Sequence, residues 1–333
     1  MKKRKRFLLL VICTIYTCRS WLKCTFFYGG TEMRNFIFTD LAYESYEMKN
    51  EESLWTKEYC RGMSGELRVF EMRIEKEEQV ARYGRPRGHY LTVLCDKIWG
   101  LEVPTLNALR ETIASIVFRL IRGRLGDEDR PRTILVVGLG NDTFTVDALG
   151  PRAVEQIQAT RHLLEDAEGE EAAFLLATLI PRVKADTGME AAEQIRGVVH
   201  TIGADAVLVL DALAASHYER LGATVQISDS GICPGSGIGN TRRAITEQTV
   251  GVPVISLGVP TVVDAATLIC DALQQSGTQT LTLPMKEAIS RYHGLFVCPK
   301  ESDLITKGAA FLLADAVQLL GGIKRGDDAY SEA

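Results

Sequence analysis

The sequence predicts an α/β protein with a doubly wound, mostly parallel sheet flanked by helices. Short apolar runs rich in β-branched residues, which are typical of buried strands, alternate with segments whose apolar residues recur at helical spacing. Glycines and aspartates follow several of these runs, where a strand would leave the sheet. Alternating strands and helices favour parallel strands with helices packed on both faces.

The N-terminal half contains few clear elements. Met33–Met48 is expected to start extended and to pass into a helix with Thr39 or Asp40 as its N-cap. The other elements expected in this half are a strand at Tyr90–Cys95, an amphipathic helix at Pro104–Arg122, a buried strand at Ile134–Val137 and a helix at Ala148–Thr160.

The C-terminal half has a regular β-α-β pattern. Strands are expected at Ala172–Leu179, Ala206–Leu210, Thr224–Ile227 and Val252–Leu257. Helices are expected at Met189–Ile202, at Val263–Leu273 with a cap near Thr261, and at Phe311–Leu320. The strand that begins at Ala206 is expected to end at Asp211, and residues 323–333 are expected to form a disordered polar tail.

Composition excludes several classes of function. The 333 residues carry a formal net charge of -5 and no basic face outside the termini, which argues against a nucleic-acid partner. The five histidines are scattered without metal-site spacing, and the eight cysteines contain no CxxC pair. We therefore expect no metal, no other cofactor, no disulfide framework and a location in a reducing cytoplasm.

Residues 1–32 differ from the rest of the chain. A basic cluster, Lys2–Arg6, precedes an apolar run, Phe7–Cys18, which is shorter than the roughly 20 residues of a membrane span. The run has the length of a signal peptide, but no small-residue cleavage site follows it. Codons for Gly29-Gly30 can form a ribosome-binding site just before Met33. We expect Met33 to be the natural first residue, with a signal peptide as the alternative.

Two aspartates are the first candidates for chemistry. Asp147 and Asp211 each begin a DAL tripeptide, one after a loop and one after a strand. In open α/β sheets, sites form beyond the carboxyl ends of the strands. Both aspartates are also suited to cap a helix. The alternative is a carboxylate pair, in which one group keeps a proton while the other activates water.

A glycine-rich loop, Gly231–Asn240, follows the strand at Thr224–Ile227. It contains four glycines but neither the GK[ST] ending of a phosphate loop nor a GxGxxG pattern. We expect it to line a cleft for an extended peptide; an anion-binding role is the alternative. Cys233 within it is either a nucleophile or a thiol without function, and no histidine is near it in sequence.

Longer motifs carry a resemblance to a known family. In chain order they are TDLAYE (Thr39–Glu44), GLGNDTFTVDALGP (Gly138–Pro151), ATRHL (Ala159–Leu163), DTGMEAAEQIRGVV (Asp186–Val199), LVLDALAA (Leu208–Ala215), QISDSGICPGSGIGN (Gln226–Asn240), GVPVISLGVPTVVDA (Gly251–Ala265) and CPKESD (Cys298–Asp303). Together they resemble the germination protease of endospore-forming bacteria, over roughly Met33 to Leu320.

The resemblance implies an atypical aspartic-type endopeptidase whose fold is similar to that of hydrogenase-maturation proteases. Its essential aspartates fall on Asp147 and Asp211, and its substrates are small acid-soluble spore proteins in the spore core. It also implies a homotetramer made as a zymogen that cuts itself at Asp40–Leu41. Residues 33–40 would then be the propeptide and residues 41–322 a single peptidase domain, with no membrane or nucleic-acid partner.

The cleft is expected to be lined by the following residues: Asn141, Gly188, Glu190, Gly235, Gly237 and Asn240. The chain departs from the family pattern at Phe38, which replaces arginine, and at Cys233, which replaces histidine. Arg182, Ala185 and Ala191 replace glycine, glycine and threonine in a loop of the cleft, and a long insertion before the C-terminal motif is absent.

Three alternatives stay open on the sequence. One is a small-molecule hydrolase or phosphorylase on a similar sheet, which would use the loop Gly231–Asn240 for an anion. Another is a non-catalytic binding protein that kept the fold. The third is a divergent paralogue with reduced activity, because the substituted loop would line the cleft.

Overall fold

The computed structural model describes residues 36–48, 67–126, 131–162, 174–235, 242–278 and 280–322, and the backbone of 56–61. The expectations for residues 1–32, for the tail 323–333 and for Gly237 and Asn240 lie outside these ranges. No helix within them is long and apolar enough to cross a membrane.

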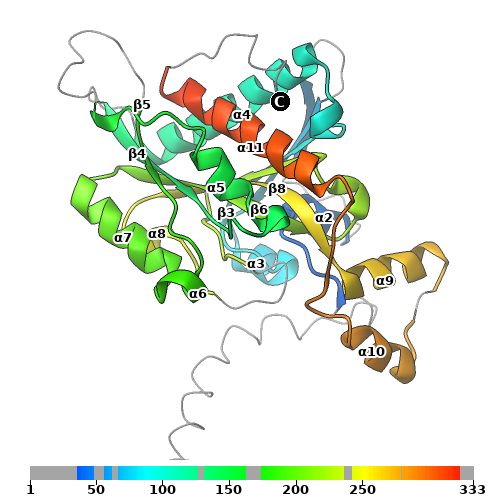
Figure 1. Cartoon of the computed structure of the whole chain (residues 1–333). Coiled ribbons are helices and arrows are strands. Elements are labelled where there is room, and N and C mark those ends of the chain that lie inside the picture. The colour runs from blue at the N-terminus through cyan, green and yellow to red at the C-terminus, as the bar shows by residue number, and fades with distance from the viewer. Residues whose placement is uncertain are drawn as a thin grey trace, which may run out of the picture.

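The strands of the described chain form one nine-stranded sheet in the order β1-β2-β3-β7-β8-β6-β4-β5, with β9 paired to β8 (Figure 1). Their bounds are β1 Thr56–Arg61, β2 Leu67–Ile74, β3 Gly88–Leu94, β4 Arg132–Gly138, β5 Phe174–Leu179, β6 Ala206–Ala215, β7 Thr224–Ser228, β8 Val254–Asp264 and β9 Phe296–Val297.

The sheet is mixed rather than mostly parallel. Strands β5, β4, β6 and β8 are parallel to one another. Strands β7, β3, β2 and β1 extend this core as an antiparallel ribbon. The sequence analysis missed β1 and β2, because their many charged residues hide the strand pattern. The parallel core with flanking helices is confirmed.

Helices cover both faces of the sheet. Their bounds are α2 Ala42–Glu47, α3 Glu77–Tyr83, α4 Val103–Leu125, α5 Leu149–Val154, α6 Lys184–Thr187, α7 Ala191–Ile202, α8 Glu247–Val250, α9 Ala265–Gln275, α10 Leu283–Ser290 and α11 Ser302–Leu320. Helices α4, α5 and α11 lie on one face, and α7 and α8 lie on the other (Figure 1).

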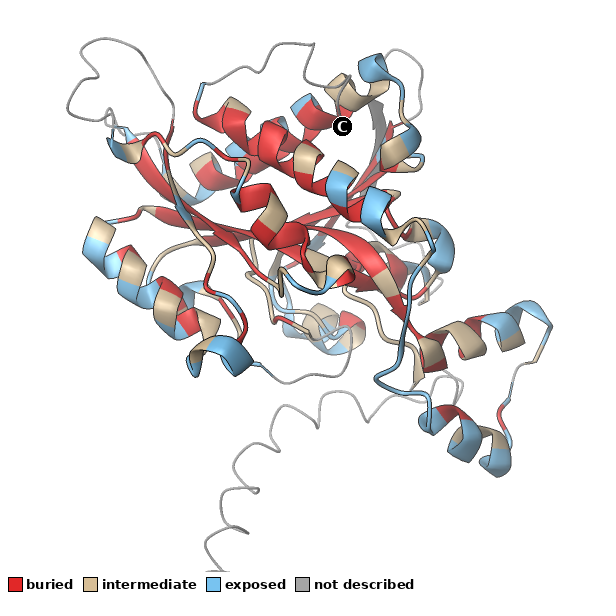
Figure 2. Cartoon of the chain, in the orientation of Figure 1, coloured by how far each residue is buried: buried red, intermediate tan, exposed pale blue. Residues whose placement is uncertain are grey.

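Strand β4 shows how the core is divided. Ile134 and Val136 belong to the hydrophobic cluster under α4, α5 and α11, whereas Leu135 and Val137 belong to the cluster under α7 and α8. All four side chains are fully buried, because successive residues of a strand point to opposite faces and both faces are covered. Figure 2 shows the buried strands between the two helical layers.

Strands β6 and β8 are longer than the sequence pattern predicts. The expected strand Ala206–Leu210 continues to Ala215, so the expectation that it ends at Asp211 is wrong. Likewise, Val252–Leu257 is replaced by a strand that continues to Asp264. The two strands pair with each other along this extension, and their mutual hydrogen bonds keep both extended.

Helix α9 begins later than expected. The sequence predicted Val263–Leu273 with a cap near Thr261, but α9 starts at Ala265. Its N-cap is Asp264, whose carboxylate accepts a hydrogen bond from the backbone N–H of Thr267 at 3.0 Å. The cap therefore stands at the end of the lengthened strand β8.

Helix α5 is much shorter than the expected helix Ala148–Thr160. It ends at Val154, and the chain then turns toward β5, where the N–H of Thr160 donates to the carbonyl of Leu176 at 2.8 Å. Because the N–H of Thr160 is bonded to strand β5, it cannot also bond to a helical carbonyl four residues earlier. The helix therefore cannot continue through Thr160.

Other boundaries differ as follows. Helix α11 starts at Ser302 rather than Phe311, and the N-cap of α2 is Leu41 rather than Thr39 or Asp40. Helices α3, α6, α8 and α10 and strand β9 were not predicted. The remaining elements, expected at Tyr90–Cys95, Pro104–Arg122, Ile134–Val137, Ala172–Leu179, Met189–Ile202 and Thr224–Ile227, are confirmed in their described residues to within three residues at each end.

Candidate active site

The parallel core brings Asp211 beside the end of β4. Strand β4 pairs with β6 so that Gly138 stands opposite Leu210, the residue before Asp211. One residue beyond β4, the N–H of Leu139 still donates to the carbonyl of Leu210 at 2.9 Å. Asp211 is therefore held inside the sheet, flanked by strands, and only 6% of its surface is exposed.

Asp147 is carried by the loop that follows β4. It ends a short 3-10 turn, Thr145–Asp147. Two threonine hydroxyls fix this turn: that of Thr261 donates to the carbonyl of Val146 at 2.6 Å, and that of Thr306 donates to the carbonyl of Thr145 at 3.0 Å. The turn is thus tied to both β8 and α11, and the carboxylate it presents has a fixed position.

Two glycines allow the backbone to approach both aspartates. Gly140 has φ +120°, and a Cβ at this residue would lie 1.9 Å from the carbonyl oxygen of Asp147. Gly258 is the β8 partner of Asp211, and a Cβ there would lie 2.7 Å from the carbonyl oxygen of Asp211. A side chain at either glycine would therefore displace an aspartate.

Asp147 and Asp211 line the same cavity, which has a volume of about 210 Å³. Its other charged lining residues are Asp40, Glu190, Arg182, Lys184, Arg242 and Arg243. The arginines and the lysine come from the loop after β5, from α6 and from the segment that follows the glycine-rich loop. The sequence analysis did not name Lys184, Arg242 or Arg243, although only Thr241 separates Arg242-Arg243 from that loop. The described residues contain no group of three or more His, Cys, Asp or Glu placed to hold a metal ion.

The two carboxyl groups differ in proton affinity. Burial raises the pKa of Asp211 well above its ordinary value of 3.8, and the charges of Asp147 and Asp40 raise it further. Burial also raises the pKa of Asp147. At each aspartate the rise is opposed by one backbone N–H, that of Asn141 at 2.8 Å from Oδ2 of Asp147 and that of Ala212 at Asp211, and by the charge of Arg242. The pKa of Asp211 is thus raised further than that of Asp147, and an asymmetry of this kind suits a paired acid and base.

Neither aspartate caps a helix. Asp211 lies in the middle of a strand, where its carboxylate accepts the N–H of Ala212 at 2.9 Å. The N-cap of α5 is Ala148, without a side-chain hydrogen bond. The capping interpretation of both residues is therefore wrong.

The residues expected to line the cleft have different positions. Glu190 and Gly235 line the cavity. Asn141 does not line the cavity, but its backbone N–H donates to the carboxylate of Asp147, which does. Gly188 is the exposed left-handed residue that ends α6, with φ +73°, and it does not line the cavity.

Two of the substitutions in the cleft loops have structural consequences. Arg182 has φ +58°, a left-handed conformation that strains any residue with a side chain. Glycine, which the family resemblance implies at this position, would adopt it without strain. Its guanidinium lies 3.2 Å from the carboxylate of Asp142. The thiol of Cys233 donates to the carbonyl of Arg242 at 3.5 Å, and burial raises its pKa, which disfavours the thiolate that a nucleophile needs.

The expected processing site lies at the cavity. The N–H of Asp40 donates to the carbonyl of Ala214, and the N–H of Ala214 donates to Oδ2 of Asp40, both at 2.9 Å. Strand β6 therefore holds Asp40 three residues beyond Asp211. Leu41, the next residue, is fully buried in a cluster with Leu213 and Val263.

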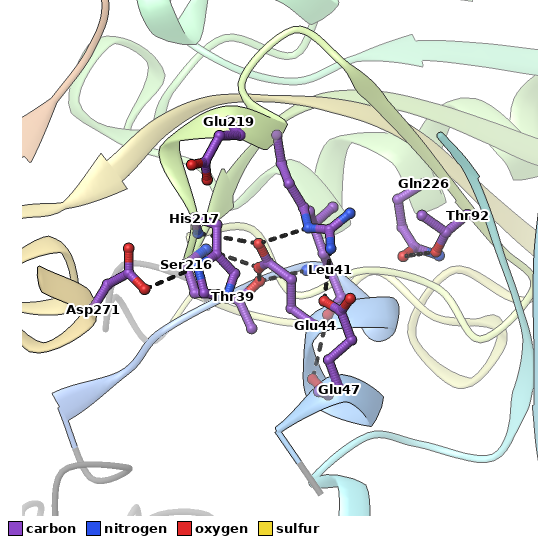
Figure 3. Close-up of polar contacts among 12 residues, drawn as sticks. Thr39, Leu41, Glu44, Glu47, Thr92, Ser216, His217, Glu219, Gln226 and Asp271 are labelled. Atoms are coloured by element: carbon purple, nitrogen blue, oxygen red, sulfur yellow. Dashed lines mark hydrogen bonds and ion pairs between the residues drawn. The ribbon is translucent and has the colours of Figure 1, made fainter. Parts of the chain in front are cut away.

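Glu44 anchors the chain that follows the processing site. Its side chain is fully buried and accepts the backbone N–H groups of Ser216 at 2.8 Å and His217 at 3.1 Å. It also accepts the hydroxyl of Thr39, and Nε of Arg220 lies 3.4 Å from Oε1 (Figure 3). This network connects α2 to the chain just after β6.

Comparison with known proteins identifies the family. The profile of the germination protease family matches residues 32–277. The chain is 36% identical over 308 residues to a germination protease of Caldanaerobacter subterraneus subsp. tengcongensis, covering 85% of this chain and 93% of that protein. It is 34% identical over 314 residues to a germination protease of Clostridium tetani, covering 85% and 94%.

A solved structure is also similar in part. A nickel–iron hydrogenase maturation protease of Thermococcus kodakarensis is 17% identical, with a TM-score of 0.33 and coverage of 62% of this chain and 99% of that one. This likeness is weak. The profile match and the relatives cover most of the chain, and by them the chain belongs to the germination protease family.

Proposed function

We propose that this germination protease is an aspartic-type endopeptidase in which Asp147 and Asp211 activate water. The observation that supports it best is the pair of carboxyl groups lining one cavity with unequal proton affinities. Family membership supports a peptidase and argues against the small-molecule phosphorylase and the non-catalytic binding protein.

The unequal pKa values suggest the order of proton transfers. Ionised Asp147 takes a proton from water, whose oxygen attacks the scissile carbonyl carbon, while Asp211 gives its proton to the carbonyl oxygen. When the tetrahedral intermediate collapses, one hydroxyl returns its proton to Asp211, and Asp147 gives its proton to the leaving amine. Both carboxyl groups then have their starting protonation states.

Small acid-soluble spore proteins are the proposed substrates. The position of Asp40 supports an acidic residue before the cut, because β6 holds that side chain through a backbone N–H and Arg242 and Arg243 line the same cavity. Purified chain incubated with one such protein should produce discrete fragments that begin after an acidic residue. No cleavage, or cleavage at unrelated residues, would contradict the proposal. We further propose that the chain forms a homotetramer and acts in the spore core. Sedimentation measurements test whether the homotetramer forms.

The chain should also process itself between Asp40 and Leu41. The bond after Asp40 borders the cavity that contains both aspartates, and mild acid keeps Asp211 protonated beside two other carboxyl groups. N-terminal sequencing after incubation at mildly acidic pH should therefore find a new terminus at Leu41. The matched control is Asp40→Ala, which removes the side chain that β6 holds and should slow the cut. A shortened chain with a different terminus would show that the propeptide assignment is wrong.

Ionisation of Asp211 should destabilise the folded chain. Because its folded-state pKa is raised, this residue contributes stability that is fully present below its unfolded value of 3.8 and is lost as pH rises through the folded pKa. Asp211→Asn cannot ionise, so its Tm should exceed that of the wild type above that pKa, by about 2–4 °C for each 1 kcal/mol of relieved penalty. The difference should shrink toward pH 4.

Thermal unfolding across pH measures this effect. The exposed Asp186→Asn is the control and should follow the wild type at every pH. If the curves of Asp211→Asn and the wild type run parallel from acid to alkaline pH, the raised pKa of Asp211 is not a property of the folded chain.

A further inference from the structure

The segment before the processing site, residues 36–40, is held at alternate residues. Asp40 is paired with Ala214 of β6. Two residues earlier, the N–H of Phe38 donates to the hydroxyl of Thr267 at 3.0 Å, and that hydroxyl donates to the carbonyl of Phe36 at 3.0 Å. The backbone of the segment is thus bound from α9 to the cavity in the way that a protease binds an extended peptide.

The side chains of this segment contact one histidine ring. The ring of Phe38 meets that of His293 edge-on, with centroids 4.8 Å apart and an interplanar angle of 86°. The ring of Phe36 is stacked near His293 at 5.9 Å and 18°. Both are favourable arrangements for aromatic pairs. His293 follows α10, which projects with α9 from one end of the sheet (Figure 1).

His293 is fixed by groups other than the segment. Its Nδ1 lies 3.4 Å from Oδ1 of Asp264, the buried residue that caps α9. The second oxygen of Asp264 accepts the N–H of Gly294 at 3.0 Å. The carboxylate of Asp264 therefore orients both the His293 ring and the turn that carries it. The ring would keep this position after the segment has left.

We infer that His293 forms a specificity subsite for an aromatic residue at the third position before the cleaved bond. In this chain Phe38 occupies that position relative to the Asp40–Leu41 bond. The favoured substrate is an extended peptide with an aromatic residue, any residue and an acidic residue before the cut. The inference rests on the proposed peptidase site, and it goes beyond it because the family resemblance implies arginine where this chain has Phe38.

Peptides with the sequence of residues 34–45 test the subsite, with Phe, Tyr, Ala or Arg at the third position before the cut. For the wild type, kcat/KM should be roughly 2- to 10-fold higher with Phe or Tyr than with Ala, the range that one aromatic pair contributes. In His293→Ala this preference for Phe or Tyr over Ala should disappear. The control His200→Ala, at an exposed position of α7, should keep the preference. Equal kcat/KM for all four peptides in the wild type would overturn the inference.

A second measurement does not depend on peptide cleavage. In the full chain carrying Asp147→Asn, which prevents processing, amide hydrogen exchange reports the docking of Phe38 and Asp40, whose N–H groups are both bound. Phe38→Tyr should retain their protection. Phe38→Ala, Phe38→Arg and His293→Ala should speed exchange, again by roughly 2- to 10-fold.

The two measurements separate the possible failures. If no peptide is cleaved by any variant, the proposed peptidase site fails, and the exchange data alone decide whether the ring selects an aromatic residue. If Phe38→Ala and His293→Ala exchange at the unsubstituted rate, the subsite is overturned even when peptides are cut. If exchange responds but cleavage shows no aromatic preference, the ring docks the propeptide only, and the specificity role is overturned.

Discussion

Replacing Asp147 or Asp211 by asparagine should reduce peptide cleavage by about 10²–10⁴-fold, the usual contribution of one acid–base group. Asparagine keeps the size of the side chain but neither accepts nor donates the required proton. Because the two groups act as a unit, the double variant should be little slower than either single variant. Cleavage rates and thermal unfolding measured on the same samples test this expectation.

The control is Asp186→Asn, an exposed carboxylate of α6 outside the cavity, which should leave the cleavage rate unchanged. Full folding together with loss of cleavage in the two cavity variants would support the paired mechanism. If either asparagine variant cleaves at the wild-type rate, the proposal that both aspartates activate water has to be abandoned. A wild type with no cleavage would instead favour the divergent-paralogue alternative.

Glu44→Ala should destabilise the chain by about 3–5 kcal/mol, the usual cost of removing one partner from a buried ion pair. Glu44 is fully buried, and its loss leaves the N–H groups of Ser216 and His217 and the guanidinium of Arg220 without this acceptor (Figure 3). Denaturant unfolding of the full chain measures the free energy of unfolding.

The matched control is Glu47→Ala, because Glu47 contacts the same guanidinium. Its carboxylate lies 2.7 Å from Nη2 of Arg220, but 37% of its side chain is exposed. An exposed pair contributes about 0–1 kcal/mol, so this variant should unfold close to the wild type. Equal losses in the two variants would mean that burial of Glu44 is not what makes the network stabilising.

Parts of the fold that depend on local pattern could be predicted from the sequence. Strand β4 and helix α4 were found because an apolar β-branched run and a helical spacing identify them without their neighbours. The two DAL tripeptides likewise drew attention to Asp147 and Asp211. The charged strand β2 was missed, because its role depends on the strands β1 and β3 beside it.

Other features depend on contacts between distant parts of the chain. Strand β6 runs past Asp211 only because β8 pairs with it, so a sequence reader expects a strand end and a helix cap there. The raised pKa of Asp211 needs Asp147 and Asp40 beside it in a buried place. None of these neighbours is adjacent in sequence, and burial is not visible in a local pattern.

The sequence by itself predicted the parallel core and the family and drew attention to Asp147 and Asp211, because long ordered motifs and apolar periodicity are properties of the chain alone. Only the tertiary structure decided that both aspartates share one cavity, and that Asp40 is bound to β6 beside them. It also decided that the ring of Phe38 meets His293. The physical reason is that these contacts join segments far apart in the chain, and the paired strands β6 and β8 with the cap of α9 fix where those segments meet.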